Sequence, residues 1–244
     1  MAEREAMKRR VVAGMLPAAG DVGQRRLADF AFEYMRDLLL EGVLVAGDGL
    51  SAEEVGTRLG ISRYPVMEAL KRLDAEGYIR IVPQVGCIVT EPDPNEIADF
   101  YSFFALFEAE ITALAAKRRL PEEVDALTLV SRRLGRFIEE AHSARESARA
   151  YRQLNRAFHS QIHLMSRSPA ITRMADRFWD RSDFYIATVR GPQIFADRIR
   201  TAHEEHEAAL QAIEAGDSRA ARRWMLAHIR AIGKTVSARR GEAG

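Results

Sequence analysis

The segment over residues 50–90 constrains the fold of this 244-residue chain more than any other part of it. It contains two short helical patterns separated by a single glycine. The first pattern covers 52–59 and begins with Ser51 and Glu54, which have the spacing of a capping box. The second covers 62–76 and also ends at a glycine. Two helices joined by so short a connection predict a helix-turn-helix.

Two runs rich in β-branched residues follow, over 78–82 and 87–90. The residues between them, 83–86, include proline and glycine and are typical of a turn, so the runs predict a β-hairpin wing. An amphipathic helix over 24–41 precedes the segment. Proteins that place one helix in the major groove of DNA use this arrangement. The pattern therefore predicts a winged helix-turn-helix DNA-binding domain over 24–92.

Composition excludes several other classes of protein. The formal net charge of +1 does not by itself indicate a nucleic-acid partner. The single cysteine, Cys87, excludes an internal disulfide framework, and we expect an inert packing residue there more than a redox sensor. The chain has no apolar run of about 18 residues and no signal-peptide core, so we expect a cytoplasmic protein with no membrane partner. Residues 1–23 have weak periodicity and predict a flexible tail.

The run SRYPVMEAL at the start of the second helix resembles the Ser-Arg-Thr-Pro-Val-Arg-Glu-Ala-Leu motif of the GntR family of bacterial transcription regulators. The resemblance implies double-stranded operator DNA as the partner, with Arg63 at a guanine or a phosphate. It also implies phosphate contacts from Ser62 and from the wing around Gly86. Tyr64 and Met67 depart from the motif. If the family's contact is bidentate, loss of the second arginine removes up to about 3 kcal/mol of base discrimination.

The predicted DNA contacts lie at the two helix starts, along the second helix and in the wing. They are Ser51, Ser62, Arg63, Tyr64, Lys71, Arg72, Gln84 and Gly86. Two interpretations of Tyr64 are open, because its ring either contacts DNA or packs on the wing.

Residues 91–94, Glu-Pro-Asp-Pro, are a stiff turn-forming segment at which we place a domain boundary. Beyond it the periodicity predicts helices and no strand. The helical segments are 95–118, 121–142, 145–166, 168–190, 193–215 and 217–238. Short connections of this kind favour an antiparallel helical bundle, here over 93–240. The expected fold is therefore mainly α, with an N-terminal winged helix-turn-helix and a C-terminal bundle.

Three of the bundle helices each carry a histidine on their apolar stripe: His159, His206 and His228. A single buried histidine is usually a core residue with a satisfied hydrogen bond. Three histidines on separate stripes of one bundle are typical of a site for a first-row metal ion. Both interpretations remain open from spacing alone.

The pattern Asn155-x3-His159, with His206 and His228 further on, resembles the FCD ligand-binding domain of the FadR-like GntR branch in its smaller, six-helix, VanR-like form. The resemblance covers residues 24 to about 238. It implies a divalent metal, zinc or nickel, held by these four residues and completed by a carboxylate effector. Asn155 replaces the family's usual aspartate. A neutral donor set should weaken metal retention and strengthen the attraction to an anionic effector.

A second departure from the FCD pattern concerns the first helix of the bundle. The family's frequent arginine is Phe104 here, ahead of Phe107 and Glu108, which predicts a more apolar pocket and a less polar ligand. His163 and His203 lie within a turn of the proposed ligands, and each is a candidate to substitute for Asn155.

The leading hypothesis is a homodimeric, effector-responsive transcription regulator, not an enzyme. In a second hypothesis the bundle only dimerises and the histidines are core residues. The enzymatic alternative is a three-histidine metal hydrolase. Glu205 and Glu207 flank His206 but point to different helix faces, so neither is well placed as its general base.

Overall fold

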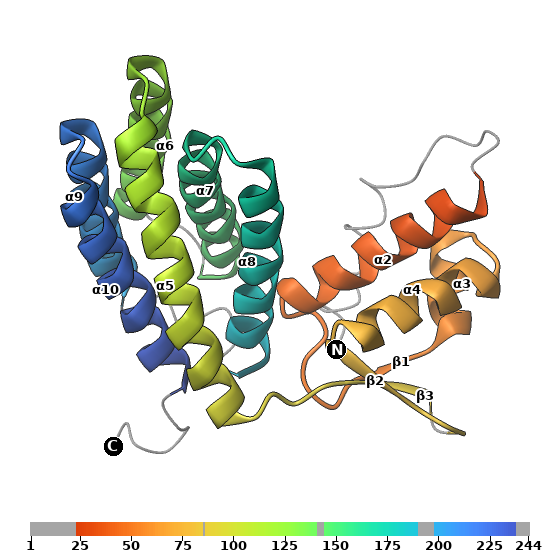
Figure 1. Ribbon diagram of the computed structural model, residues 1–244. Helices are drawn as coiled ribbons and strands as arrows, with labels where there is room; N and C mark the ends of the chain where they lie inside the picture. Colours follow the sequence, from red (N-terminus) through yellow and green to blue (C-terminus); the bar gives the residue numbers. More distant parts are fainter. Residues whose placement is uncertain (1–22, 85, 141–143, 190–197, 238–244) are drawn as a thin grey trace. The chain divides into compact units, whose positions relative to one another are not determined.

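The computed structural model describes residues 23–84, 86–140, 144–189 and 198–237 (Figure 1). These described residues form nine helices and one three-stranded antiparallel sheet. The predicted mainly α class with a small wing is thereby confirmed. The predicted tail lies outside the described residues except for Gly23.

The chain divides into two compact units between Pro92 and Asp93, within the predicted hinge. The first unit comprises residues 1–92 with 187–189, and the second comprises 93–186 with 190–244. Each unit therefore has its own core.

The N-terminal unit contains the predicted helices and strands and one further strand. They are α2 (Gln24–Leu40), α3 (Ala52–Leu59), α4 (Arg63–Ala75), β1 (Gly49–Leu50), β2 (Ile79–Val82) and β3 (Gly86–Val89). The strands have the spatial order β1-β3-β2. On β3, Ile88 is opposite Gly49 on one side and Arg80 on the other. The sequence did not predict β1, because a two-residue strand has no alternation to detect.

Capping and glycine geometry produce the turn between α3 and α4. The Ser51 hydroxyl accepts a hydrogen bond from the Glu54 amide at 3.3 Å, as the capping-box spacing predicts. Gly60 ends α3 with φ of +67°, a left-handed conformation that costs glycine nothing. The helix-turn-helix is thus encoded locally.

The core of the N-terminal unit lies between α4 and α2. Val66, Leu70 and Leu73 of α4 are buried, as are Met35 and Leu39 of α2. Because these α4 positions share one face, the opposite face and the N-terminal end of the helix remain exposed.

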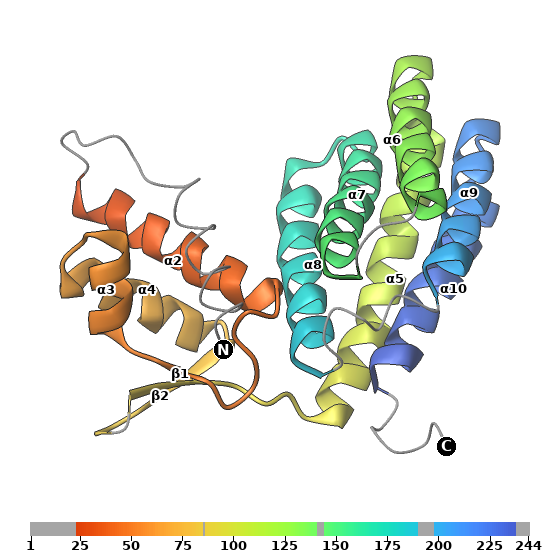
Figure 2. The same ribbon diagram turned by 180° about the vertical axis from the view of Figure 1, so that it is seen from behind.

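The C-terminal unit contains only helices among its described residues. They are α5 (Pro94–Arg118), α6 (Pro121–Glu139), α7 (Ala144–Met165), α8 (Pro169–Val189), α9 (Ile199–Ala215) and α10 (Ser218–Ser237). Their bounds confirm the six predicted segments, although parts of four, over 141–142, 190, 193–197 and 238, lie outside the described residues. α5 packs against α7, α9 and α10, and α6 packs against α7 and α9 (Figures 1 and 2).

α5 begins with a strong cap and packs closely on its main neighbour. The Asp93 carboxylate accepts hydrogen bonds from the Asn95 and Glu96 amides, and Pro94 occupies the first helical position. Further along, α5 and α10 approach closely where Gly233 faces Tyr101. None of the described helices has the length and apolar character needed to span a membrane.

Candidate metal site and DNA-binding surface

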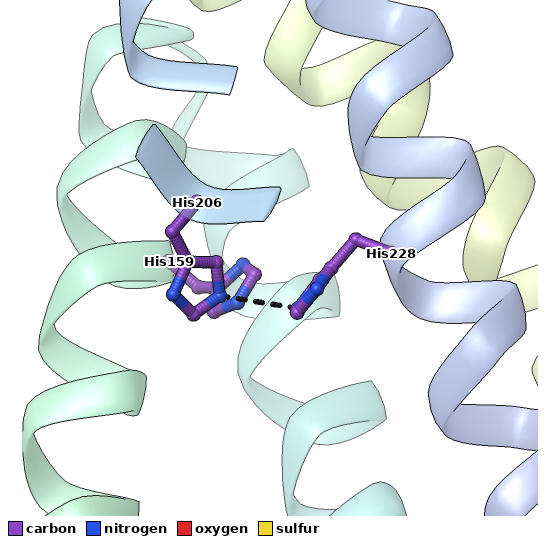
Figure 3. A group of neighbouring side chains, drawn as sticks. All are labelled: His159, His206 and His228. Atoms are coloured by element: carbon purple, nitrogen blue, oxygen red, sulfur yellow. Dashed lines mark hydrogen bonds between the residues drawn. The ribbon is translucent and has the colours of Figure 1, made fainter. Parts of the chain in front are cut away.

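Three histidines from three different helices meet inside the C-terminal unit (Figure 3). His159 comes from α7, His206 from α9 and His228 from α10, and at most 1% of each is exposed. One ring nitrogen of each lies within 4.8 Å of the corresponding nitrogens of the other two. The predicted convergence of these side chains is therefore present.

Aromatic packing holds these rings in place. The His206 ring stacks on Phe158 with 4.5 Å between centroids, and the His159 ring lies 4.2 Å from the indole of Trp179. Each histidine continues an apolar stripe of its helix, so ordinary core burial brings the rings together.

The ring nitrogens have the separations that a shared metal ion requires, and some of them have no hydrogen-bond partner. The Nε2 atoms of His206 and His228 are 3.1 Å apart. Two nitrogens that share a zinc ion at about 2.0–2.1 Å lie roughly 3.3 Å apart in tetrahedral geometry. Nε2 of His159 and Nδ1 of His206 are buried without a hydrogen-bond partner, and His159 Nδ1 has only a Glu108 oxygen at 3.4 Å. Buried imidazole nitrogens normally have partners, so the cluster fits a divalent cation better than a plain core.

Burial also keeps these imidazoles in the form that binds metals. Desolvation lowers the pKa of His159 to about 4, although Glu108 opposes the shift, and it lowers the pKa of His206 well below its ordinary value. Neutral imidazole is the ligand form. At neutral pH His159 and His206 are therefore deprotonated and available as ligands.

Two carboxylates lie behind the cluster, and the sequence analysis did not assign a role to either. Glu108 of α5 is fully buried, with one oxygen 3.4 Å from His159 Nδ1. Glu205 of α9 has an oxygen 2.7 Å from His228 Nδ1. Glu108 lies between Phe104 and Ile111 on the buried stripe of α5. The sequence pattern could have identified it as a functional residue, because a buried acid needs a partner.

The two histidines considered as substitutes for Asn155 have other neighbours. His163 Nε2 lies 2.9 Å from a Glu108 oxygen. His203 lies against α6, where a β-carbon at Gly135 would be 2.7 Å from its Nε2. The group of nitrogens that could share an ion includes neither of them. Asn155 is half-buried, and its role as a metal ligand remains a prediction.

A pocket opens beside the cluster, and Asn155 is part of its wall. The other lining residues are Tyr151, Arg152, Trp179, Ser182, Asp183, Ile186, Arg198, Ala202 and Ile232. Most of the lining is apolar, with two arginines. Asp183 accepts a long hydrogen bond from Arg152 at 3.4 Å. Arg198 donates to both oxygens of Glu205, and its Nε is buried without a partner.

Phe104, which stands where the resemblance expects an arginine, is not part of that pocket wall. It is 1% exposed and belongs to a cluster of aromatic rings from α5 and α8. The cluster comprises Phe100, Tyr101, Phe104, Phe107, Phe178, Trp179 and Tyr185. This position is therefore part of the core.

The predicted DNA contacts at the start of α4 are exposed. Ser62, Arg63 and Tyr64 all lie on the surface, and 60% of Tyr64 is accessible. Such exposure disfavours packing of Tyr64 on the wing. The Ser51 hydroxyl accepts the Glu54 amide as the cap of α3, and its hydrogen remains available to donate to a phosphate oxygen.

The two predicted DNA contacts further along α4, Lys71 and Arg72, already take part in ion pairs. Lys71 is exposed but paired with Glu68 at 2.8 Å. Arg72 bonds to Asp29 of α2 at 2.6 Å and lies over the Phe32 ring. A DNA contact by Arg72 would therefore have to share or break an existing ion pair.

The wing presents the last two predicted DNA contacts at its tip. Gln84 and Gly86 are exposed there, and both have positive φ, at +64° and +121°. Their backbone amides and the Gln84 side chain are therefore on the surface of the turn. Contact of either residue with phosphate remains a prediction.

Both carboxylates that the enzymatic alternative considered as a general base are already bound among the described residues. Glu205 is bound to His228 and Arg198, and Glu207 accepts a hydrogen bond from Ser131. A hydrolase requires a carboxylate that can take a proton from metal-bound water. Neither flanking carboxylate is in that position.

Comparison with known families matches most of the chain in two blocks. Residues 27–89 match the family described as bacterial regulatory proteins, gntR family, and residues 99–231 match the FCD domain. The hinge at Pro92 and Asp93 lies between the two blocks.

Known proteins of similar sequence are transcription regulators. An uncharacterised HTH-type regulator from an unstable DNA locus of Streptomyces ambofaciens is 27% identical over 209 residues, which cover 81% of this chain and 80% of the relative. The transcriptional repressor GlaR of Escherichia coli K12 is 23% identical over 199 residues, covering 81% and 90%.

Two solved structures have a similar fold. Escherichia coli McbR/YncC aligns with a TM-score of 0.67 and 23% identity, covering 84% of this chain and 93% of that one. A GntR regulator from Rhodococcus aligns with a TM-score of 0.68 and 19% identity, covering 87% and 99%. At these identities the likeness establishes the fold.

Proposed function

Because the chain belongs to the GntR family of bacterial transcription regulators and carries an FCD domain, we propose that it is a homodimeric regulator whose helical unit senses a small organic acid at a divalent metal ion. Its relatives are regulators and not enzymes. Its place of action would be the cytoplasm, where bacterial operator DNA is found.

The observation that carries the proposal is the meeting of His159, His206 and His228 with unpartnered buried nitrogens. These three imidazoles would hold the ion, and the Asn155 side-chain oxygen would be a fourth, neutral donor. Zinc and nickel both accept imidazole ligands. The ion, when bound, supplies a Lewis-acidic centre for the carboxylate of an effector.

The chemistry of the pocket lining suits an organic acid with an apolar body, and the cavity, which has room for about one water molecule, would have to widen to admit it. Tyr151, Trp179 and Ile186 provide apolar wall. Arg198 provides a cation whose Nε donor is buried without a partner. Because the expected arginine at 104 is absent, Arg198 is the residue of this chain that would meet the anionic group.

Regulation follows if the effector binds one dimer arrangement better than another. The effector shifts the equilibrium by its difference in affinity for the two arrangements and by no more. Such a shift would change the distance between the two recognition helices α4 and so the fit to two operator half-sites.

The test is a mobility shift on the DNA upstream of the chain's own gene, with and without zinc and a panel of small organic acids. We expect specific, salt-sensitive binding that at least one acid alters only in the presence of metal. Absence of specific binding would refute DNA recognition. Specific binding with no metal in protein purified without chelator, and no thermal shift with any acid, would favour a bundle that only dimerises.

A further inference from the structure

Two of the three clustered histidines have a carboxylate at the ring nitrogen that faces away from the cluster. His228 Nδ1 lies 2.7 Å from Glu205, while its Nε2 points to His206. His159 Nδ1 lies 3.4 Å from Glu108. An imidazole that donates a proton from Nδ1 keeps the lone pair on Nε2. Each carboxylate therefore favours the tautomer that leaves Nε2 free for an ion.

The two carboxylates are themselves held in place from behind. Arg198 donates to both oxygens of Glu205, at 2.8 and 2.7 Å. His163 Nε2 lies 2.9 and 3.1 Å from the two oxygens of Glu108. A carboxylate with two anchored oxygens cannot rotate away from its histidine. The orientations of His159 and His228 are thus supported before any ion binds.

Charge gives the carboxylates a second role. Three neutral imidazoles and Asn155 leave the charge of a divalent ion without a counter-charge among its ligands. Glu108 is fully buried, and its carboxylate contacts His159 and His163. No permanent cation is paired with Glu108 among the described residues, whereas Glu205 is paired with Arg198. A buried, unbalanced carboxylate favours a nearby cation.

We propose that Glu108 and Glu205 are positioning residues for the divalent ion: they orient His159 and His228 from behind, and Glu108 adds the negative charge that Asn155 does not supply. The inference rests on the proposed metal site. It also explains how a donor set without an aspartate would retain an ion.

The test measures release of zinc to a colorimetric chelator from full-length protein, and the visible spectrum of protein reconstituted with cobalt. Glu205→Gln removes the charge but keeps an acceptor, and Glu205→Ala removes both. We expect release to accelerate about 10- to 100-fold for Glu205→Gln and further for Glu205→Ala, with altered cobalt spectra. Glu204→Gln, at the exposed neighbouring position of α9, is the matched control and should behave as wild type.

Glu108→Gln should accelerate release in the same way, and its fold is checked by circular dichroism. If that variant does not fold, the Glu205 series decides. Wild-type protein that binds neither zinc nor cobalt would overturn both the proposed metal site and this inference. Wild-type protein that retains zinc, with both Gln variants and Glu205→Ala indistinguishable from Glu204→Gln, would overturn this inference alone.

Discussion

The ring of Phe104 packs edge-on against the indole of Trp179, with 5.3 Å between centroids. The same indole lies 4.2 Å from the His159 ring. The position at which the resemblance expects an effector-binding arginine is therefore part of the aromatic core that supports the histidine cluster. An arginine there would have to bury its charge among aromatic rings.

Phe104→Arg should destabilise the C-terminal unit by about 3 kcal/mol or more, because it buries an unpaired charge and removes aromatic packing. Phe103→Arg is the matched control, because Phe103 is the neighbouring residue and 73% exposed, and it should change stability by no more than about 0.5 kcal/mol. Both tryptophans belong to this unit, so urea unfolding followed by tryptophan fluorescence reports on it selectively. Equal stability of the two variants would show that position 104 is open to a ligand.

Close packing of α5 on α10 gives a second prediction. A β-carbon at Gly233 would lie 2.5 Å from the Tyr101 β-carbon, which cannot move without the α5 backbone. Gly233→Ala should therefore cost about 1–3 kcal/mol in the free energy of unfolding. Gly135→Ala on α6 meets only the ring tip of His203 and gains helix propensity, so it should be neutral or stabilising. The prediction fails if the two variants have the same unfolding midpoint.

Much of this fold could be predicted because its signals are local. Prolines at 121 and 169 mark helix starts in the bundle, and the glycine at 216 marks a helix end. The spacing of apolar residues predicts that each clustered histidine faces inward. The partners of buried charges could not be predicted in this way. Glu108 meets His163, 55 residues away, and Arg72 meets Asp29, 43 residues away, because of how helices register against each other. Periodicity gives the buried face of a helix but not the residue that it contacts.

Asn155 provides a test of the ligand set. If its side-chain oxygen is a donor to the ion, Asn155→Asp adds a charged ligand and should slow zinc loss to a chelator by about tenfold, the effect of roughly 1.4 kcal/mol. Gln153→Glu makes the same chemical change two residues earlier, at an exposed position of α7. It should leave the rate unchanged. An equal rate for Asn155→Asp and wild type would place Asn155 outside the ligand set.

Cys87 should be inert in the native protein. Burial in β3 raises the pKa of its thiol, and Asp74 adds to the shift. A raised pKa means less thiolate at a given pH, and the thiolate is the reactive form. We therefore expect slow alkylation by iodoacetamide at pH 8 in native protein, and a rate typical of a free thiol in urea. Fast alkylation of the native protein would instead support redox sensing at Cys87.

The last prediction concerns DNA binding by the exposed start of α4. Arg63 is on the surface with Tyr64, and Met67 replaces the second arginine of the family motif, so base discrimination should rest heavily on Arg63. Arg63→Ala should weaken specific binding by about 1–3 kcal/mol and flatten the preference for the specific site over unrelated DNA. Arg230→Ala, an exposed arginine of α10, removes the same charge from the other unit and should leave both quantities unchanged. If Arg63→Ala lowers binding to specific and unrelated DNA equally, Arg63 contacts phosphate only, and its loss should then reduce the slope of the salt dependence by about one.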